Sequence, residues 1–187
     1  MGKNADTVAS RWLLPSFLPG TSYAAGRGKQ GIPSMEFGGS YLVSAPREKV
    51  WHALNDTNVL KAIIPGCRRI DWTGATTLEL EIEVNLGLMQ PVFTGDLELR
   101  NIVPATSYTL AGKGRGGLLG KAEAAADITL SDDGPNTRLV FAASGGADGG
   151  IMKLGKSLVG KSAQKVIDGF FESFGKAMGA EVTPLSV

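Results

Sequence analysis

The chain contains 187 residues, of which 43% are hydrophobic and 20% are charged, a balance typical of a globular domain rather than a disordered chain. Its net charge of +1 argues against a general nucleic-acid-binding protein. One cysteine, Cys67, and one histidine, His52, exclude a disulfide framework and multi-cysteine or two-histidine metal motifs, and we expect no metal site. Glycine is the anomaly, because 26 residues is close to twice its usual share of about 7%.

The chain divides into three segments by composition. Residues 1–34 have no hydrophobic periodicity, which predicts a flexible tail or an upstream extension. The globular domain extends over residues 35–178, and residues 179–187 form a short C-terminal tail. No run of roughly 18 apolar residues occurs, so the sequence predicts no membrane-spanning segment.

The predicted elements begin with a strand over residues 37–43. Two short helices follow, over 47–54 and 58–64; Pro46 opens the first, and Pro65 with Gly66 ends the second. Residues 78–88 alternate between apolar even positions and polar or glycine odd positions, which predicts a strand with one buried face. Further strands are expected over 92–101, 107–116, 118–130 and 137–145, and a long amphipathic helix over about 150–178. This order predicts an α+β fold, a curved antiparallel sheet wrapped around the long C-terminal helix.

Small residues gather on the inward face of the predicted strands. Alternation and hairpin pairing bring glycine and alanine together at one end of the sheet and large apolar residues at the other. Because interiors are close-packed, the missing volume predicts an apolar ligand cavity. The residues expected to line it are Leu88, Phe93, Gly95, Gly112, Gly114, Gly120, Ala122, Ala124, Phe141, Ala143, Gly145, Ile151, Leu154 and Leu158. The alternative is that the glycines serve only to bend the strands around the helix.

Several motifs resemble those of a known family. They are Met35-Glu36-Phe37, Ser44-Ala45-Pro46-Arg47-Glu48-Lys49-Val50-Trp51, Ile64-Pro65-Gly66-Cys67 and Phe170-Phe171-Glu172-Ser173-Phe174. Over about residues 35–178 the chain resembles the CoxG subunit of carbon monoxide dehydrogenase. The Ala-Pro-x-x-x-Val-Trp opening is shared by the wider START-like, polyketide-cyclase (SRPBCC) superfamily. The resemblance implies a helix-grip fold.

The resemblance also implies a function. Such a protein is a non-enzymatic accessory of an aerobic molybdenum carbon monoxide dehydrogenase or related hydroxylase. It binds a quinone or lipid, links the enzyme to the membrane, and resides in the cytoplasm at the inner membrane face. Its partners are the hydroxylase subunits and the hydrophobic ligand, with no cofactor beyond that quinone or lipid. Two alternatives stay open: a cyclase or aromatase enzyme, and an assembly factor without ligand. The almost wholly apolar inward faces favour the carrier over the enzyme.

No catalytic residue is predicted. His52 has no acidic partner on the inward faces, which favours a solvated surface histidine, and Cys67 follows a Pro-Gly turn in an apolar context. Glu79, Glu81 and Glu83 occupy the outward positions of their strand and are expected to face water.

A membrane contact is predicted at the hairpin over residues 116–120. Leu118 and Leu119 lie on this glycine-rich tip, and Lys113, Arg115 and Lys121 flank it. Apolar side chains ringed by basic ones suit an anionic membrane surface. The alternative is that Leu118 packs under the helix and the cations only keep the protein soluble.

Overall fold

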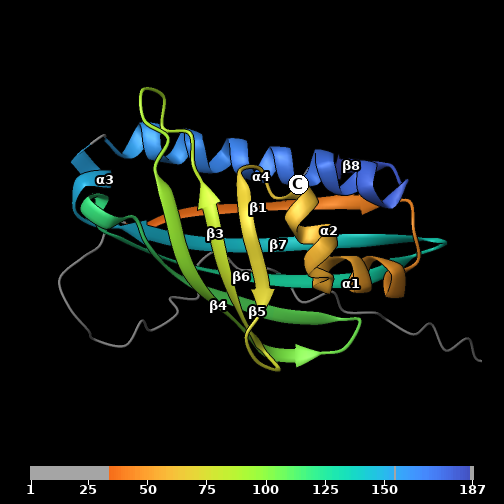
Figure 1. The fold of residues 1–187 in the computed structure, drawn as a ribbon. Helices are drawn as coiled ribbons and strands as arrows, with labels where there is room; N and C mark the ends of the chain where they lie inside the picture. Colours follow the sequence, from red (N-terminus) through yellow and green to blue (C-terminus); the bar gives the residue numbers. More distant parts are fainter. Residues whose placement is uncertain (1–33, 154, 186–187) are drawn as a thin grey trace, which may run out of the picture. The chain divides into compact units, whose positions relative to one another are not determined.

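An eight-stranded antiparallel sheet curves around one long helix in the computed structural model, which describes residues 34–153 and 155–185 (Figure 1). The strand order is β2-β3-β4-β5-β6-β7-β1-β8. The strands are β1 (Ser34–Val43), β2 (Cys67–Trp72), β3 (Thr77–Glu83), β4 (Val92–Val103), β5 (Ser107–Arg115), β6 (Lys121–Asp133), β7 (Asn136–Ala147) and β8 (Val182–Leu185). The predicted α+β class and helix-wrapping sheet are confirmed. The first 33 residues, where a tail was predicted, lie outside the described residues.

Two short helices connect β1 to β2. Helix α1 (Arg47–Asn55) starts directly after Pro46, and α2 (Thr57–Ile63) starts after Asp56, whose carboxylate accepts hydrogen bonds from the backbone N–H groups of Asn58 and Val59. This side-chain cap satisfies donors that have no partner within the helix. Figure 1 shows both helices near the C-terminal half of the long helix.

The long C-terminal helix is interrupted near its start. The sequence predicted one helix over 150–178, but the structure has α3 (Gly150–Lys153) and α4 (Lys156–Met178) with Gly155 between them at φ +93°. An L residue rarely adopts this backbone conformation, so the glycine permits the break. Helix α4 ends at Gly179, at φ +59°, whose N–H donates to the Gly175 and Lys176 carbonyls.

Two predicted strands were too long. Strand β3 ends at Glu83, and residues 84–91 form a narrow hairpin in which Leu86 N–H donates to the Met89 carbonyl. Residues 118–120 belong to the 3₁₀ turn η1 (Gly117–Leu119) and its cap, because Gly117 and Gly120 have φ +60° and +98°. Positive φ values of this kind break an extended strand.

Two edge strands were not predicted individually. Strand β2 pairs with β3, and β8 pairs with β1, where the sequence predicted only a short tail. Strand β8 has four residues including Pro184, so it shows no alternating pattern. Ser44 and Glu181 fasten it to the domain through two hydrogen bonds, 2.9 Å and 2.7 Å long.

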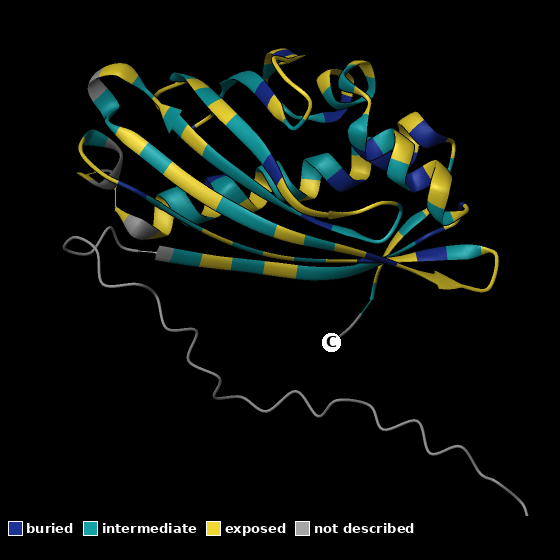
Figure 2. Cartoon of the chain, turned by 90° about the horizontal axis from the view of Figure 1, so that it is seen from below, coloured by how far each residue is buried: buried dark blue, intermediate teal, exposed yellow. Residues whose placement is uncertain are grey.

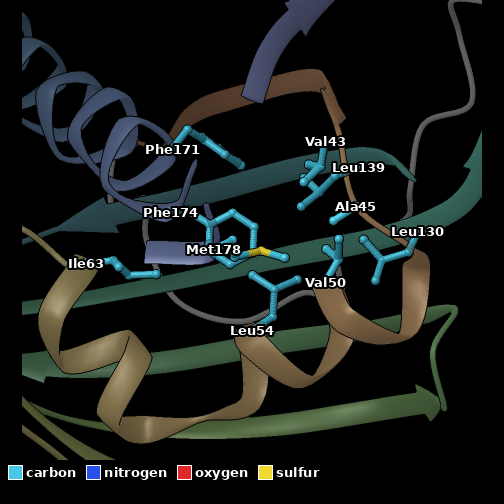
Figure 3. Close-up of a cluster of buried hydrophobic side chains, with 10 residues drawn as sticks. All are labelled: Val43, Ala45, Val50, Leu54, Ile63, Leu130, Leu139, Phe171, Phe174 and Met178. Carbon is cyan, nitrogen blue, oxygen red and sulfur yellow. The ribbon is translucent and has the colours of Figure 1, made fainter. Parts of the chain in front are cut away.

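The packed core lies under the second half of α4. Phe174, fully buried, sits with Phe171 and Met178 against Val43 of β1 and Leu139 of β7 (Figure 3). Helix α1 closes the cluster with Val50 and Leu54. Along the strands, exposed and less exposed residues alternate, as expected for a sheet with one covered face (Figure 2).

We expect Phe174→Ala to lower the free energy of unfolding by about 3–5 kcal/mol, because it removes a fully buried ring from this core. Denaturant unfolding followed by circular dichroism measures the loss. Val140→Ala is the matched control, since Val140 is 40% exposed on β7, and we expect a change within about 0.5 kcal/mol. Equal losses in the two variants would contradict this position of the core.

Candidate ligand cavity

Cross-strand pairing places small residues in two adjacent rows on the face of the sheet toward α4. One row consists of Leu80, Gly95, Gly114, Ala122 and Ala147. The next consists of Leu97, Gly112, Ala124, Gly145 and Met35. Farther along the strands the rows contain Tyr108, Ile128 and Phe141, and then Leu130, Leu139 and Tyr41. Side-chain volume therefore falls steeply from one end of the sheet to the other.

Beneath the first half of α4 these rows leave a cavity of about 430 Å³, which we call the glycine compartment. Its floor includes Gly95, Gly114 and Ala122, which are half-buried rather than packed. The first half of α4 covers it with Val159, Ser162, Ala163 and Val166. The hairpin that leaves β3 forms a side wall with Val84 and the buried Leu86.

A second cavity, of about 340 Å³, lies toward the core and is called here the aromatic compartment. Aromatic side chains contribute much of its wall: Trp72, Tyr108, Phe141, Phe170 and Phe171. Leu80, Leu97, Ala143, Val166 and Ile167 line both compartments, so the two adjoin. Together they form an elongated apolar space between the sheet and α4.

The glycines on this face of the sheet do not all have the same role. A Cβ atom on Gly112 would lie 2.8 Å from Leu97 Cδ2, and one on Gly145 would lie 3.1 Å from the Glu123 carbonyl oxygen, so a larger residue at either position needs a neighbour to shift. A Cβ on Gly114 would meet no atom nearer than 3.8 Å. Gly114 therefore leaves open space that a side chain could occupy.

Most predicted cavity residues converge on this space. The glycine compartment is lined by Phe93, Gly95, Gly112, Gly114, Ala122, Ala124, Ala143 and Gly145, and the aromatic compartment by Phe141. The side chains of Ile151 and Leu154 lie outside the described residues. Whether a ligand occupies the space stays a prediction.

Three predicted residues lie elsewhere. Leu88 is fully exposed at the tip of the 84–91 hairpin, because Gly87, at φ +90°, turns the chain there. Gly120 faces Asp148, whose carbonyl oxygen would lie 2.7 Å from an added Cβ. Leu158 is 37% exposed in the first turns of α4, since the helix directs Val159 and Ser162 inward instead.

The sequence-based prediction did not include several other residues that line the cavity. Ile82, Val84 and Leu86 belong to the even positions whose alternation was recognised in the sequence, and that pattern could have identified them. Val159 could be placed only once the rotation of α4 over the sheet was known.

The Ile64-Pro65-Gly66-Cys67 motif has a structural role. A Cβ on Gly169 of α4 would lie 2.9 Å from Pro65 Cγ, so the helix passes very close to this turn. Gly66, at φ +77°, accepts a 2.8 Å hydrogen bond from Glu83 N–H, and a Cβ there would collide with the Glu83 carbonyl. The motif thus joins α2, β3 and α4.

The residues considered for catalysis do not assemble into a site. His52 is exposed on α1. Cys67 is half-buried, and burial raises the pKa of its thiol, with Lys61 opposing the shift. Glu79 pairs with Arg69 at 3.1 Å, and Glu83 pairs with Arg68. In residues 34–153 and 155–185 no cluster of three or more acidic, histidine or cysteine side chains is arranged to hold a metal ion.

The basic residues near η1 have acidic neighbours. Arg115 donates to Asp96 at 3.1 Å, and Lys113 lies 3.9 Å from Glu123. Lys121 is exposed and Leu119 half-buried, and the Leu118 side chain lies outside the described residues. Membrane contact by this tip stays a prediction; no helix within the described ranges is long and apolar enough to cross a bilayer.

Comparisons with known proteins identify the fold and family. The family model for CoxG, a subunit of carbon monoxide dehydrogenase, matches residues 39–179. A conserved protein from Geobacillus kaustophilus is 22% identical, with a TM-score of 0.71, over 80% of this chain and 99% of its own. The Mll3558 protein from Rhizobium loti is 15% identical, with a TM-score of 0.62, over 79% and 99%. The Zhui aromatase/cyclase from a Streptomyces species is 13% identical, with a TM-score of 0.59, over 78% and 94%. No curated protein matches the chain. The expected START-like helix-grip fold is confirmed.

Substitutions that fill the glycine compartment test whether it binds apolar molecules. We expect Gly114→Leu, and likewise Ala122→Leu, to weaken binding of the neutral fluorescent probe N-phenyl-1-naphthylamine by about tenfold or more, because the new side chain occupies the space. The fold should survive, since an open cavity wall accepts volume better than a packed core.

Ala111→Leu is the matched control, because Ala111 lies on the same strand and lines a hollow on the opposite face of the sheet. Probe fluorescence and thermal unfolding are measured together. Unchanged probe affinity in Gly114→Leu, or unfolding of both cavity variants, would overturn the assignment of the cavity.

Proposed function

The chain belongs to the CoxG family of carbon monoxide dehydrogenase subunits, and from that membership we propose that it is an accessory protein that carries a hydrophobic ligand for its hydroxylase. The partner is a molybdenum-containing carbon monoxide dehydrogenase or related hydroxylase. The ligand is a quinone or lipid. The protein itself is non-enzymatic, and it works in the cytoplasm at the inner face of the membrane.

The elongated apolar space under α4 is the observation that carries this proposal. Its two compartments measure about 430 and 340 Å³, a size suited to a small-molecule ligand. Each CH₂ group that moves from water into such a space contributes about 0.8 kcal/mol. A long apolar chain therefore binds without any charged contact.

The main alternative is an enzyme of the cyclase or aromatase kind. That chemistry requires acid, base or oxyanion-stabilising groups that converge on one reacting atom. Here the buried hydroxyls of Tyr108 and Ser162 line different compartments, and His52 is exposed. The likeness to the Zhui aromatase/cyclase, at 13% identity, concerns the fold alone. The carrier is favoured for these reasons.

Exchange of such a ligand with a membrane requires a contact near the cavity. The 84–91 hairpin offers Leu88, fully exposed, and Met89, 38% exposed, at its tip, while Val84 and Leu86 of the same hairpin line the glycine compartment. Lys161 and Lys165 are exposed on the first half of α4, which covers the same compartment. Two exposed apolar side chains, with cations on the helix that covers the same compartment, support weak, reversible docking on anionic lipid.

Organic extraction of the purified protein tests the ligand. We expect a quinone or lipid to be extracted in amounts approaching one molecule per chain, identified by mass spectrometry. Gly114→Leu protein prepared in the same way should retain much less. A wild-type protein that carries no apolar molecule, and that fails to bind one when it is supplied, would favour the ligand-free assembly factor.

Co-sedimentation with phosphatidylglycerol vesicles tests the membrane contact. We expect binding at low salt that falls as salt rises, and a loss of about tenfold or more in Leu88→Ser, since one buried leucine is worth about 1.5–3 kcal/mol. Val103→Ser is the matched control, because Val103 is 51% exposed at the end of β4 instead.

The double variant Lys113→Glu/Arg115→Glu tests in the same assay whether the η1 tip contacts the membrane. A loss confined to that double variant would assign the contact to η1. No binding by the wild-type protein at low salt would remove the membrane contact altogether.

A further inference from the structure

The first half of β1 is an open edge of the sheet. Strand β1 pairs with β7 over residues 34–43, but β8 covers its other side only over residues 40–43. No other described segment forms a backbone hydrogen bond with residues 34–39, and in Figure 2 this stretch runs along the margin of the sheet. Unpaired N–H and C=O groups along a strand edge are a ready template for a further strand.

The direction of these groups follows from the hydrogen bond that fastens β8. Ser44 N–H donates to the Glu181 carbonyl at 2.9 Å, in register with the ladder between β1 and β8, so the backbone groups of Ser44 face β8. Because backbone groups alternate in direction along a strand, those of Glu36 and Gly38 face the open side. Both residues are exposed. The edge therefore presents the N–H and C=O groups of both residues to an incoming strand.

The other two edges of the sheet are protected against such pairing. Strand β2 carries the charged residues Arg69 and Asp71 and has a bulge at its start. Strand β8 contains Pro184, whose nitrogen has no hydrogen to donate. Charges, bulges and proline are the usual protections of an edge strand. Residues 34–39 contain no proline and pair with β7 without a bulge, so this edge is open to a partner.

Helix α4 runs beside β1 in the same direction. A Cβ on Gly160 would lie 3.6 Å from Met35 Sδ, and Phe171 stacks on Tyr41 with ring centroids 3.8 Å apart. Phe37 lies a third of the way along β1 between these two contacts. The corresponding point on α4 therefore lies about one turn beyond Gly160.

The exposed flank of α4 carries charges of both signs around this level. Gln164 donates to the Asp168 carboxylate at 2.8 Å, and Lys161 precedes both residues; all three are exposed. Burial and the Asp168 carboxylate raise the pKa of Tyr41, which indicates that Asp168 lies on the β1 side of α4. This flank thus offers a positive group before the level of Gln164 and a negative group after it.

We infer that the chain forms a two-fold dimer in which the open edge of β1 pairs antiparallel with the same edge of a second copy. Glu36 pairs with the partner's Gly38, the reverse pair forms by symmetry, and Phe37 meets the partner's Phe37 at the axis. The two sheets then form one continuous sheet. Met35 and Phe37 line the glycine compartment, so the interface adjoins the cavity of each copy.

The register follows from charge and size. A pair of Glu36 with the partner's Glu36 would oppose two carboxylates, which is unfavourable. A shift to the partner's Gly38 avoids that repulsion and uses the outward backbone groups of both residues. Met35 then lies opposite the partner's Gly39, which has no side chain to clash with it.

The same axis makes the two α4 flanks complementary. Because a two-fold axis at Phe37 reverses the direction of the second helix, Lys161 of each copy approaches Asp168 of the partner subunit. This opposite-charge pairing on a self-complementary surface favours a second copy over an unrelated strand. The 84–91 hairpin leaves β3, near the far end of the strand order, and stays accessible in the dimer. The inference does not depend on the carrier function.

Sedimentation velocity of the full chain tests the dimer. We expect a dimer at roughly 100 µM chain that dissociates on dilution, because one strand pair and one helix flank form a small interface. Glu36→Pro removes the outward N–H and should weaken the dimer by about tenfold or more. Glu36→Thr keeps that N–H and is the matched control, with a change of less than about twofold. Proline is tolerated at an edge, so circular dichroism should show an intact fold.

A charge exchange on α4 tests the orientation of the two copies. Asp168→Lys alone should weaken the dimer by about threefold or more, since it places like charges together, and Lys161→Asp/Asp168→Lys should restore the wild-type affinity. Glu48→Lys is the matched control for the change of charge. Glu48 is exposed on α1, beyond the other end of β1, and its reversal should leave the dimer unchanged.

A disulfide across the axis is a readout that needs no substitution at Glu36. Residues opposite each other in a non-hydrogen-bonded antiparallel pair have Cα atoms about 4.5 Å apart, which a disulfide can span. In a Cys67→Ser background, Phe37→Cys should therefore form an intermolecular disulfide. Val140→Cys, at a position 40% exposed on β7, should not. Non-reducing gel electrophoresis measures both, and it decides the question if Glu36→Pro fails to fold.

Three results would overturn the inference. One is a wild-type chain that remains monomeric at this concentration. Another is a dimer that Glu36→Pro does not weaken and Phe37→Cys does not cross-link. The third is a monomer whose association with the hydroxylase is lost in Glu36→Pro, which would assign the edge to that partner instead. A cross-linked dimer that does not respond to the charge exchange would show that the α4 contact is wrong.

Discussion

The uneven support of α4 is the constraint on which the rest of the structure depends. Its second half rests on a packed layer in which Phe171 stacks on Tyr41 with ring centroids 3.8 Å apart, and Phe174 is fully buried. Its first half spans two rows in which glycine and alanine predominate, so much of the space beneath it is not filled by side chains. Because one end is packed, the other end can bridge a cavity without collapse of the fold.

The same asymmetry separates stability from function along a single helix. The buried cluster shared by α1, α2, α4, β1, β6 and β7 packs one end. At the other end the sheet is held mainly by its ladders, which do not require large side chains. Glycine contributes there in two ways, by close approach at Gly112 and Gly145 and by open space at Gly114.

Charged and apolar side chains are separated between the two faces of the sheet. The ionic residues of the sheet pair with one another at exposed positions, as Arg69 does with Glu79 and Arg115 with Asp96, so they leave the inner face apolar. The two buried hydroxyls of the cavity, Tyr108 and Ser162, are then the positions where a ligand can be recognised by hydrogen bonding rather than by volume. Specificity in such a site depends on few groups, since apolar contacts alone discriminate weakly among chains of similar shape.

The sequence by itself determined the class of fold and the distribution of side-chain volume. Alternation along a strand and hairpin pairing are local rules, so they placed Gly95, Gly114 and Ala122 together and assigned the long helix its apolar face. Only the tertiary structure decided which residues close the cavity. The turn at Gly87 moved Leu88 into solvent, the break at Gly155 set where α4 begins, and the rotation of α4 chose Ser162 over Leu158. These outcomes depend on backbone conformation at single glycines and on packing between distant segments, neither of which a hydrophobic pattern encodes.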